Sequence, residues 1–325
     1  MSSATATNSN GKRYCGRFAP SPTGPLHFGS LVAALASFCD ARAAGGKWLV
    51  RIEDVDEPRS RAGAERDILD TLRRYGLQWD GDVIRQSDRA EAYERALNAL
   101  ESSGALFRCT CTRRALQQAP VGALGERVYP GTCRDCIAVQ RTRLPVALRV
   151  RAPDAAITFV DQLQGPQTQN LAADVGDFVV KRADGLYAYQ LAVVVDDALQ
   201  EVTTIVRGAD LLASTARQIH LQRLLGLSEP SYLHIPIAIH SSGEKLSKQT
   251  HAPRLPDEPL PALQLAWRFL DQPLPDVAPR TVGDFWSWAQ RSWSRKRLPP
   301  VAMLPAPDVL EADRHLRSIA ARRYN

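Results

Sequence analysis

The chain has 325 residues, of which 44% are hydrophobic and 23% charged, and its formal net charge is +6 at pH 7. These values suit a folded protein of two or three domains and exclude a disordered or fibrous chain, while no apolar run is long enough to predict a membrane-spanning helix. The small, polar residues at the start predict a disordered tail over residues 1–12 rather than a signal peptide. Six cysteines without a secretion signal indicate reduced thiols or a metal site in a cytoplasmic protein.

The first ordered element is a short strand over Tyr14–Phe18, which leads through a turn rich in proline into a helical pattern over Leu31–Ala44. His27 and Gly29 lie at the mouth of this helix, and Ser30 is the expected N-cap. A helix N-terminus presents N–H groups and positive potential, which suit phosphate. The glycine lets a nucleotide approach the backbone and His27 can donate to a phosphate oxygen, although a lone histidine in such a turn is more often structural.

A second strand, Trp48–Ile52, ends at Glu53 and Asp54. Strand, helix and strand form a βαβ unit, and ligands of parallel sheets collect where the strands end. Glu53 is therefore placed to bind the ammonium group of a small substrate, the alternative being an ordinary surface carboxylate. Two amphipathic helices follow, with apolar stripes within residues 68–75 and 93–100 that need only a core-facing role to explain them.

A cysteine-rich segment follows Gly104. Four thiols lie within 28 residues, at Cys109, Cys111, Cys133 and Cys136. In a cytosolic chain this grouping predicts a tetrahedral structural zinc site. A short segment with few large apolar residues needs such a metal cross-link to be stable. Composition alone selects all four cysteines as ligands, and the alternative is four unrelated thiols.

The middle of the chain alternates strand-like and helical patterns. Strands are expected over Ala147–Arg151 and Ile157–Asp161, and a hairpin over residues 177–190 with its turn at Ala183–Gly185. The apolar run Leu191–Asp197 is expected to resume the parallel-sheet domain.

Arg207 follows another apolar strand, Val202–Val206, and so lies at a strand end as Glu53 does. A helix over residues 215–225 and a strand over residues 233–239 lead to a glycine-led loop that carries Lys245 and Lys248. Two lysines on such a loop can close over a triphosphate and neutralise the charge that develops on the leaving pyrophosphate. Beyond Pro253 many prolines interrupt the chain, and helices are expected over residues 262–271 and 282–293. The basic residues near the C-terminus suit either a solvated face or a surface that faces RNA.

Three ordered motifs together resemble the class I aminoacyl-tRNA synthetases. His27–Ser30 is similar to the HIGH signature of that family, with Ser30 where most members carry a second histidine, and Lys245–Gln249 is similar to the KMSKS signature. The preceding string Arg17–Gly24 is similar to the glutamyl and glutaminyl branch. The resemblance spans residues 13–251 and implies an α/β protein with a Rossmann-type nucleotide-binding fold.

The resemblance also implies a division of the chain into parts. Residues 1–12 form the tail, residues 13–105 and 186–252 a split Rossmann-type catalytic domain, residues 106–185 a zinc-containing insertion, and residues 253–325 a short, mainly helical and basic C-terminal region.

The same resemblance assigns roles to residues. For catalysis it implies His27, Lys245 and Lys248, and for ATP, which binds with Mg²⁺, it implies His27, Gly29, Ser30 and Lys248. For glutamate it implies Arg17, Phe18, Ala19, Pro20, Ser21, Glu53, Tyr189 and Arg207. Val193 stands where many members carry asparagine, which removes one polar contact.

The cysteine segment resembles the zinc element of the glutamyl-Q tRNA(Asp) synthetases, in which Cys-x-Cys is followed by Tyr-x-x-x-Cys. On this match the ligands of one structural Zn²⁺ are Cys109, Cys111, Tyr129 and Cys133, and Cys136 is left out. The choice between Tyr129 and Cys136 as fourth ligand stays open, because a phenolate is the less common zinc ligand.

This family match implies ATP-dependent activation of glutamate and its transfer to queuosine at the wobble position of tRNA(Asp). The region after the lysine loop is too short for the anticodon-binding part of a full-length glutamyl-tRNA synthetase. The expected partners are glutamate, ATP and the queuosine-bearing anticodon stem-loop, and neither DNA nor a membrane. Two alternatives remain: ordinary aminoacylation of a tRNA 3′ end, and a non-catalytic RNA-binding remnant, which the departures at Ser30 and Val193 would favour.

Overall fold

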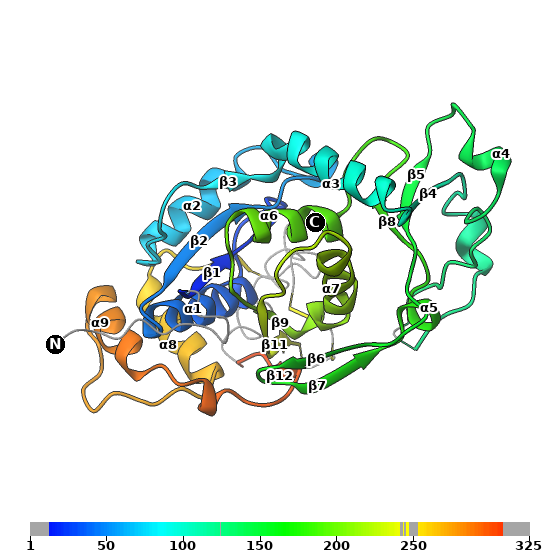
Figure 1. The fold of residues 1–325 in the computed structure, drawn as a ribbon. Coiled ribbons are helices and arrows are strands. Elements are labelled where there is room, and N and C mark those ends of the chain that lie inside the picture. Colours follow the sequence, from blue (N-terminus) through cyan, green and yellow to red (C-terminus); the bar gives the residue numbers. More distant parts are fainter. Residues whose placement is uncertain (1–12, 124, 241–242, 244, 247–252, 308–325) are drawn as a thin grey trace, which may run out of the picture.

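The computed structural model describes residues 13–307 apart from 124, 241–242, 244 and 247–252, and shows an α/β core from which an insertion projects (Figure 1). The predicted tail, Lys248 and the basic residues after position 307 lie outside the described residues. Among the residues that are described, no helix is long and apolar enough to cross a membrane.

The centre of the core is a largely parallel sheet in two parts. One part has the order β1-β2-β3 and the other β7-β6-β10-β9, with β7 the antiparallel edge strand. The backbone N–H of Thr203 donates to the carbonyl of Cys15 at 2.9 Å and joins the two parts between β9 and β1. The carboxyl ends of β1, β2, β9 and β10 therefore meet at one edge, where α/β sheets bind their ligands. The strands are β1 Cys15–Phe18, β2 Lys47–Ile52, β3 Ile84–Arg85, β6 Ile157–Asp161, β7 Gly165–Gln169, β9 Thr204–Gly208 and β10 Ser231–Ile235.

Helix α1 (Phe28–Ala43) is the centre of the first hydrophobic core. Its small residues let the sheet approach from one side, while α2 (Ala64–Arg74) and the C-terminal helices α8 (Pro259–Phe269) and α9 (Val282–Ser292) belong to the same cluster. Asp40 of α1 is buried and accepts two hydrogen bonds of 2.6 Å from Arg295. The region after the lysine loop thus contributes to the core as far as Ala306.

A second core lies between α3 (Ala90–Ser102), α6 (Tyr189–Leu199) and α7 (Thr215–Leu224). The run 191–197, expected to resume the parallel-sheet domain, lies within helix α6 and contributes no strand to the sheet. The predicted hairpin is short: one bridge joins Lys181 and Tyr187, and the backbone N–H of Arg182 donates to the carbonyl of Leu186 at 2.8 Å across the predicted turn. A short apolar run that is buried on every side cannot be assigned to a strand or a helix from its sequence, because it lacks the alternation of polar and apolar residues that distinguishes the two.

The predicted strand over residues 233–239 is divided at Pro236 into β10 and β11 (Ile237–Ile239). Proline has no N–H to continue a ladder. Strand β11 does not continue the ladder of β10 but pairs in parallel with β12 (Met303–Pro305). The end of the described chain therefore lies beside the segment that follows β10.

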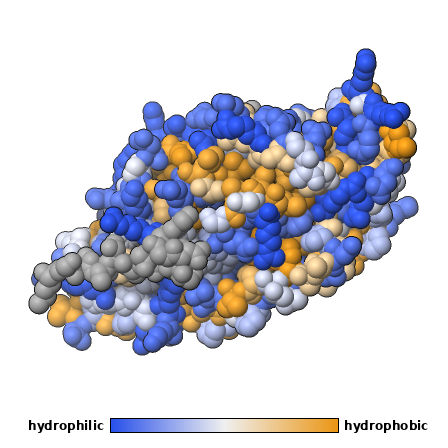
Figure 2. All heavy atoms as spheres, in the orientation of Figure 1, coloured by the Kyte–Doolittle hydropathy of each residue, from blue (hydrophilic) through white to orange (hydrophobic). Residues whose placement is uncertain are grey.

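The insertion is built on an antiparallel sheet of order β4-β5-β8 and is mostly hydrophilic at its projecting end (Figure 2). Its strands and short helices are β4 Leu106–Cys109, β5 Ala147–Val150, β8 Phe178–Lys181, α4 Ile137–Gln140 and α5 Leu171–Asp174. Within the range 106–185, β6 and β7 belong to the core sheet instead, because β6 pairs with β10 and β7 pairs with β6.

Candidate active site

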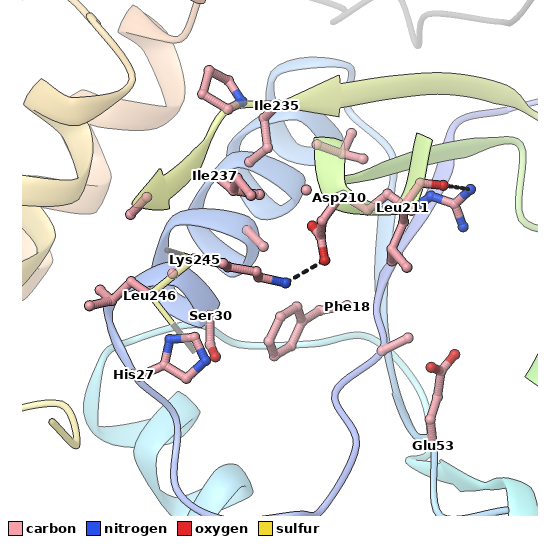
Figure 3. Close-up of a pocket in the computed structure, with 18 of the residues that line it drawn as sticks. Phe18, His27, Ser30, Glu53, Asp210, Leu211, Ile235, Ile237, Lys245 and Leu246 are labelled. Carbon is pink, nitrogen blue, oxygen red and sulfur yellow. Dashed lines mark hydrogen bonds and ion pairs between the residues drawn. The ribbon is translucent and has the colours of Figure 1, made fainter. Parts of the chain in front are cut away.

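A cavity of about 210 Å³ opens where the parallel strands end (Figure 3). It brings together most of the residues that the sequence predicts for the site. These are Arg17, Phe18, Ala19, His27, Gly29, Ser30, Glu53, Tyr189, Arg207 and Lys245. Of the others, Pro20 accepts the backbone N–H of Glu53 at 3.0 Å, Ser21 lines a neighbouring cavity, and Lys248 lies outside the described residues.

One end of this cavity is the N-terminus of α1. The helix begins at Phe28 and its N-cap is His27, so the expectation that Ser30 is the N-cap is wrong. The first helical bond runs from the N–H of Leu31 to the carbonyl of His27 at 3.0 Å. The N–H groups of residues 28–30 consequently have no acceptor within the helix, and with the positive end of the helix dipole they suit phosphate. Ser30 supplies a hydroxyl to the cavity from the first turn.

Lys245 lies at the same end of the cavity as His27 and Ser30 (Figure 3). Its segment returns along β11, where the N–H of Leu246 donates to the carbonyl of Ala238 at 2.8 Å. The ammonium of Lys245 is paired with Asp210, which follows β9 (Figure 3). The sequence motifs do not single out Asp210 as a site residue; its position shortly after Arg207, at the end of the same strand, is the signal that could have found it. His27, Ser30 and Lys245 thus surround one region of the cavity, while Glu53 lies at the other end.

A buried ion-pair network forms the wall at the Glu53 end. Asp197 of α6 accepts from Arg17 Nε at 3.1 Å and from Arg51 Nη1 at 2.8 Å, and Arg51 Nη2 donates to Glu53 at 3.2 Å. All four side chains are almost completely buried. Asp197 was missed as a site residue because nothing in its apolar run shows that it meets an arginine from the first strand.

The electrostatics of this network differ between its two carboxylates. Burial alone would raise the pKa of Asp197, but Arg17 and Arg51 outweigh it and lower the pKa below its ordinary value. Burial raises the pKa of Glu53, although Arg51 and Arg17 oppose the rise. Asp197 is therefore the fixed counter-charge, and Glu53 is the carboxylate that a ligand cation would stabilise.

Arg207 is aimed by a second buried network. His234 of β10 accepts from Arg207 Nε at 2.9 Å through its Nε2, and its Nδ1 donates to Asp161 of β6 at 2.6 Å. Burial lowers the pKa of His234 to about 4, although Asp161 opposes the change, so the ring is neutral near pH 7. Asp161 fixes the tautomer that lets His234 accept from the guanidinium. Arg207 Nη1 is buried without a hydrogen-bond partner, as an anion site would require.

The third group of polar side chains is in the insertion. The Sγ atoms of Cys109, Cys111 and Cys133 lie within 4.8 Å of one another and could hold a metal ion. The hydroxyl of Tyr129 is 3.4 Å from Cys109 Sγ and 3.9 Å from Cys111 Sγ, whereas Cys136 is exposed and outside the cluster. Three thiols and one phenol grouped in this way fit a four-coordinate soft-metal site.

The surroundings of the cluster favour negative charge on one sulfur, that of Cys133, whereas burial raises the pKa of Cys111 to about 11. Burial would raise the pKa of Cys133, but hydrogen bonds from the Thr110 backbone and from Tyr129 outweigh it and lower the pKa to about 7. Arg149 is buried, donates to Cys109 Sγ at 3.2 Å, and lies 4.0 Å above the ring of Tyr129. A positive charge beside the ligands supports thiolate coordination.

Comparison with known proteins assigns this fold and pocket to a class. The model of the catalytic domain of tRNA synthetases class I (E and Q) matches residues 15–255. A glutamate-tRNA synthetase structure from Elizabethkingia anophelis has a TM-score of 0.74 at 21% identity, with 90% of this chain and 68% of that chain covered, which shows a shared fold. The fold and the cavity are therefore those of the catalytic core of a class I aminoacyl-tRNA synthetase.

Relatives of higher sequence identity show which family within this class the chain belongs to. A glutamyl-Q tRNA(Asp) synthetase from Thiobacillus denitrificans is 55% identical over 296 residues, which cover 90% of this chain and 98% of the relative. Another from Pseudomonas aeruginosa is 51% identical over 294 residues, with 90% and 97% covered. The chain belongs to the family of glutamyl-Q tRNA(Asp) synthetases.

Proposed function

We propose that this protein activates glutamate with ATP and transfers it to queuosine at the wobble position of tRNA(Asp). The observation that carries the proposal is the single cavity that joins a phosphate-binding helix N-terminus to a pocket of two arginines and one carboxylate. Family membership supports the choice of substrates.

In the first step an α-carboxylate oxygen of glutamate attacks the α-phosphorus of ATP. The bond from that phosphorus to the bridging oxygen breaks, and pyrophosphate leaves. A Mg²⁺ ion bound with ATP would neutralise part of the charge on these phosphates. His27, Gly29, Ser30 and the N–H groups of α1 bind the phosphates, and Lys245 together with Lys248 neutralises the charge that develops on them.

The amino-acid end selects glutamate by charge. Glu53 binds the ammonium group, and Arg17, Arg207 and Tyr189 bind carboxylate. The backbone of residues 17–21 shapes the wall, since Pro20 holds Glu53 at its N–H. In the second step a hydroxyl of queuosine attacks the carbonyl carbon of glutamyl-adenylate, an ester bond forms, and AMP leaves.

In this proposal Zn²⁺ is held by Cys109, Cys111, Tyr129 and Cys133. The position of the Tyr129 hydroxyl beside two thiols supports it over the exposed Cys136 as fourth ligand. The metal has a structural role in the insertion within residues 106–185, outside the split catalytic domain of residues 13–105 and 186–252 and the C-terminal region 253–325. Reduced thiols and a tRNA substrate suit the cytoplasm.

Labelled glutamate transfer to tRNA(Asp) with and without queuosine tests the proposal, with the labelled nucleotide mapped after nuclease digestion. We expect label on the wobble nucleotide of queuosine-bearing tRNA alone. Label on the 3′-terminal nucleotide would instead establish ordinary aminoacylation, and a lack of glutamate-dependent pyrophosphate exchange would favour a non-catalytic protein.

A further inference from the structure

A second cavity, of about 580 Å³, adjoins the first. Glu53 and Tyr189 line both cavities, so an occupant of the second touches the amino-acid end of the first. The residues at the phosphate end, among them His27 and Lys245, line only the first. The second cavity therefore opens toward the activated amino acid rather than toward the nucleotide that activates it.

One wall of this cavity carries a buried acceptor. Gln86 is 1% exposed, and its Nε2 donates to Asp196 at 3.0 Å. Asp196 is fully buried and also accepts from Tyr93 at 2.7 Å and from Arg89 at 3.2 Å. A carboxylate so placed only accepts, so the amide cannot flip, and Gln86 Oε1 is left buried without a hydrogen-bond partner.

The wall is also rigid. Asp54, at the end of β2, accepts from the backbone N–H of Ser87 at 2.8 Å and from its hydroxyl at 2.7 Å. Gln86 is thus fixed on one side by its neighbour and on the other by Asp196. Because a buried acceptor without a partner costs free energy, this arrangement calls for a ligand that donates a hydrogen bond.

The rest of the lining indicates the chemistry of that ligand. Ser21, Thr23 and Ser60 contribute hydroxyl groups, and the exposed Arg61 contributes positive charge, while Asp56 and Arg59 form an ion pair with each other. The N–H of Arg61 donates to the carbonyl of Pro22 at 2.9 Å, which ties this side of the cavity to the turn after β1. Hydroxyl groups beside an arginine suit a polyhydroxylated ring attached to a phosphodiester, and Gln86 Oε1 suits a hydroxyl donor on that ring.

We infer that this second cavity is the subsite for the acceptor nucleoside, and that Gln86 accepts a hydrogen bond from one of its hydroxyl groups. The inference rests on the proposed function. A neighbouring hydroxyl oxygen bonds to the carbonyl carbon of the adenylate, the bond from that carbon to the AMP oxygen breaks with its electron pair, and the hydroxyl proton passes to water. The occupant is thus a nucleoside with two adjacent hydroxyl groups, one bound and one reacting.

Filling the cavity tests the inference. Ser60→Trp places a large side chain in it, and Ser228→Trp is the matched control, since Ser228 is exposed after α7 and lines neither cavity. Both variants and the wild type are assayed, metal-replete, for glutamate-dependent pyrophosphate exchange without RNA and for transfer to queuosine-bearing tRNA(Asp). We expect Ser60→Trp to keep exchange within about twofold and to lose at least about tenfold in transfer.

Transfer equal to the control would overturn the inference, as would a parallel loss of exchange, because the cavity would then serve activation. A wild type that exchanges pyrophosphate but labels no queuosine would overturn the proposed function itself.

A second variant, Gln86→Met, tests which group donates a hydrogen bond to Gln86 Oε1: a hydroxyl of the acceptor nucleoside or the ammonium group of glutamate. Its folding is checked by urea denaturation. We expect the KM for tRNA to rise roughly two- to tenfold with the KM for glutamate unchanged. A rise in the glutamate KM alone would assign Oε1 to the substrate ammonium and overturn the inference.

Discussion

The catalytic pocket and the cysteine cluster are both built from buried polar side chains, yet they differ in what balances the charge. In the pocket, Asp197 lies between Arg17 and Arg51, so opposite charges compensate one another within the protein. In the cluster, three thiols and a phenol face one another, and Arg149 is the cation that contacts them among the described residues.

The two regions also differ in apolar support. The pocket lies between two large hydrophobic cores, whereas the cluster has only four buried members of its own, Phe107, Cys109, Tyr129 and Cys133. We therefore expect the pocket to be preorganised before any ligand binds, and the cluster to depend on a metal ion for its stability.

Metal removal should have the largest effect, and it should be confined to the insertion. Structural zinc contributes about 10–16 kcal/mol of apparent binding free energy in zinc-finger peptides. We expect chelation to expose residues 109–143 to trypsin while tryptophan fluorescence stays native, because all six tryptophans lie outside the insertion. Cys109→Ser should lose metal in elemental analysis and Cys136→Ser should retain it. A simultaneous loss of tryptophan signal would contradict the separation of the two regions.

Removing the counter-charge of the pocket should come next. Asp197→Ala leaves two buried arginines without their shared partner, and breaking a buried pair costs about 3–5 kcal/mol. We expect that loss in urea denaturation, together with loss of pyrophosphate exchange.

Asp197→Asn, which keeps the shape, and Asp40→Asn form the matched comparison, since Asp40 is a buried partner of Arg295 away from the pocket. Both should destabilise the protein, but only the first should raise the glutamate KM. Equal KM values would show that Asp197 is structural alone.

The carboxylate that faces the substrate should impose a pH dependence. Burial raises the pKa of Glu53, and only its ionised form attracts an ammonium group. The KM for glutamate should therefore rise as pH falls through that raised pKa, at a pH above the ordinary range of a glutamate side chain. Glu53→Gln should raise the KM roughly 10- to 100-fold and abolish this acid limb, because a hydrogen bond to a charged group contributes about 1.5–3 kcal/mol. If the glutamate KM of Glu53→Gln still rose at low pH, the pH dependence would belong to another group.

The smallest effect is expected at His234. His234→Gln should misdirect Arg207 and raise the glutamate KM roughly two- to tenfold, the value of one typical hydrogen bond. His220→Gln is the control, since His220 is also buried but contacts the carbonyl of Arg151. In the wild type the folded pKa of about 4 lies below the unfolded value of about 6.5. The contribution of His234 to stability is therefore complete above pH 6.5 and falls as pH drops from 6.5 to 4.

The sequence predicts what is encoded locally. His27, Gly29 and Glu53 follow strands in motifs of fixed spacing, and the cysteine grouping is visible at once. The two buried polar networks could not be predicted in this way, because their members are far apart in the sequence. Arg17 and Asp197 are separated by 180 residues, and Asp161 and His234 by 73 residues. The helix over residues 191–197 could not be recognised, because its burial on every side hides the helical period. The helix after the first strand begins before the serine that residue preference selects as its cap.

The most direct test of the account uses an isolated anticodon stem-loop of tRNA(Asp) that carries queuosine and has no acceptor stem. The account predicts that the metal-replete protein attaches labelled glutamate to this fragment, because the activating pocket acts on a loop base that can splay out of its stack. A matched stem-loop with guanosine at the wobble position should remain unlabelled. Labelling of intact tRNA at its 3′ end, with none on the stem-loop, would contradict the account.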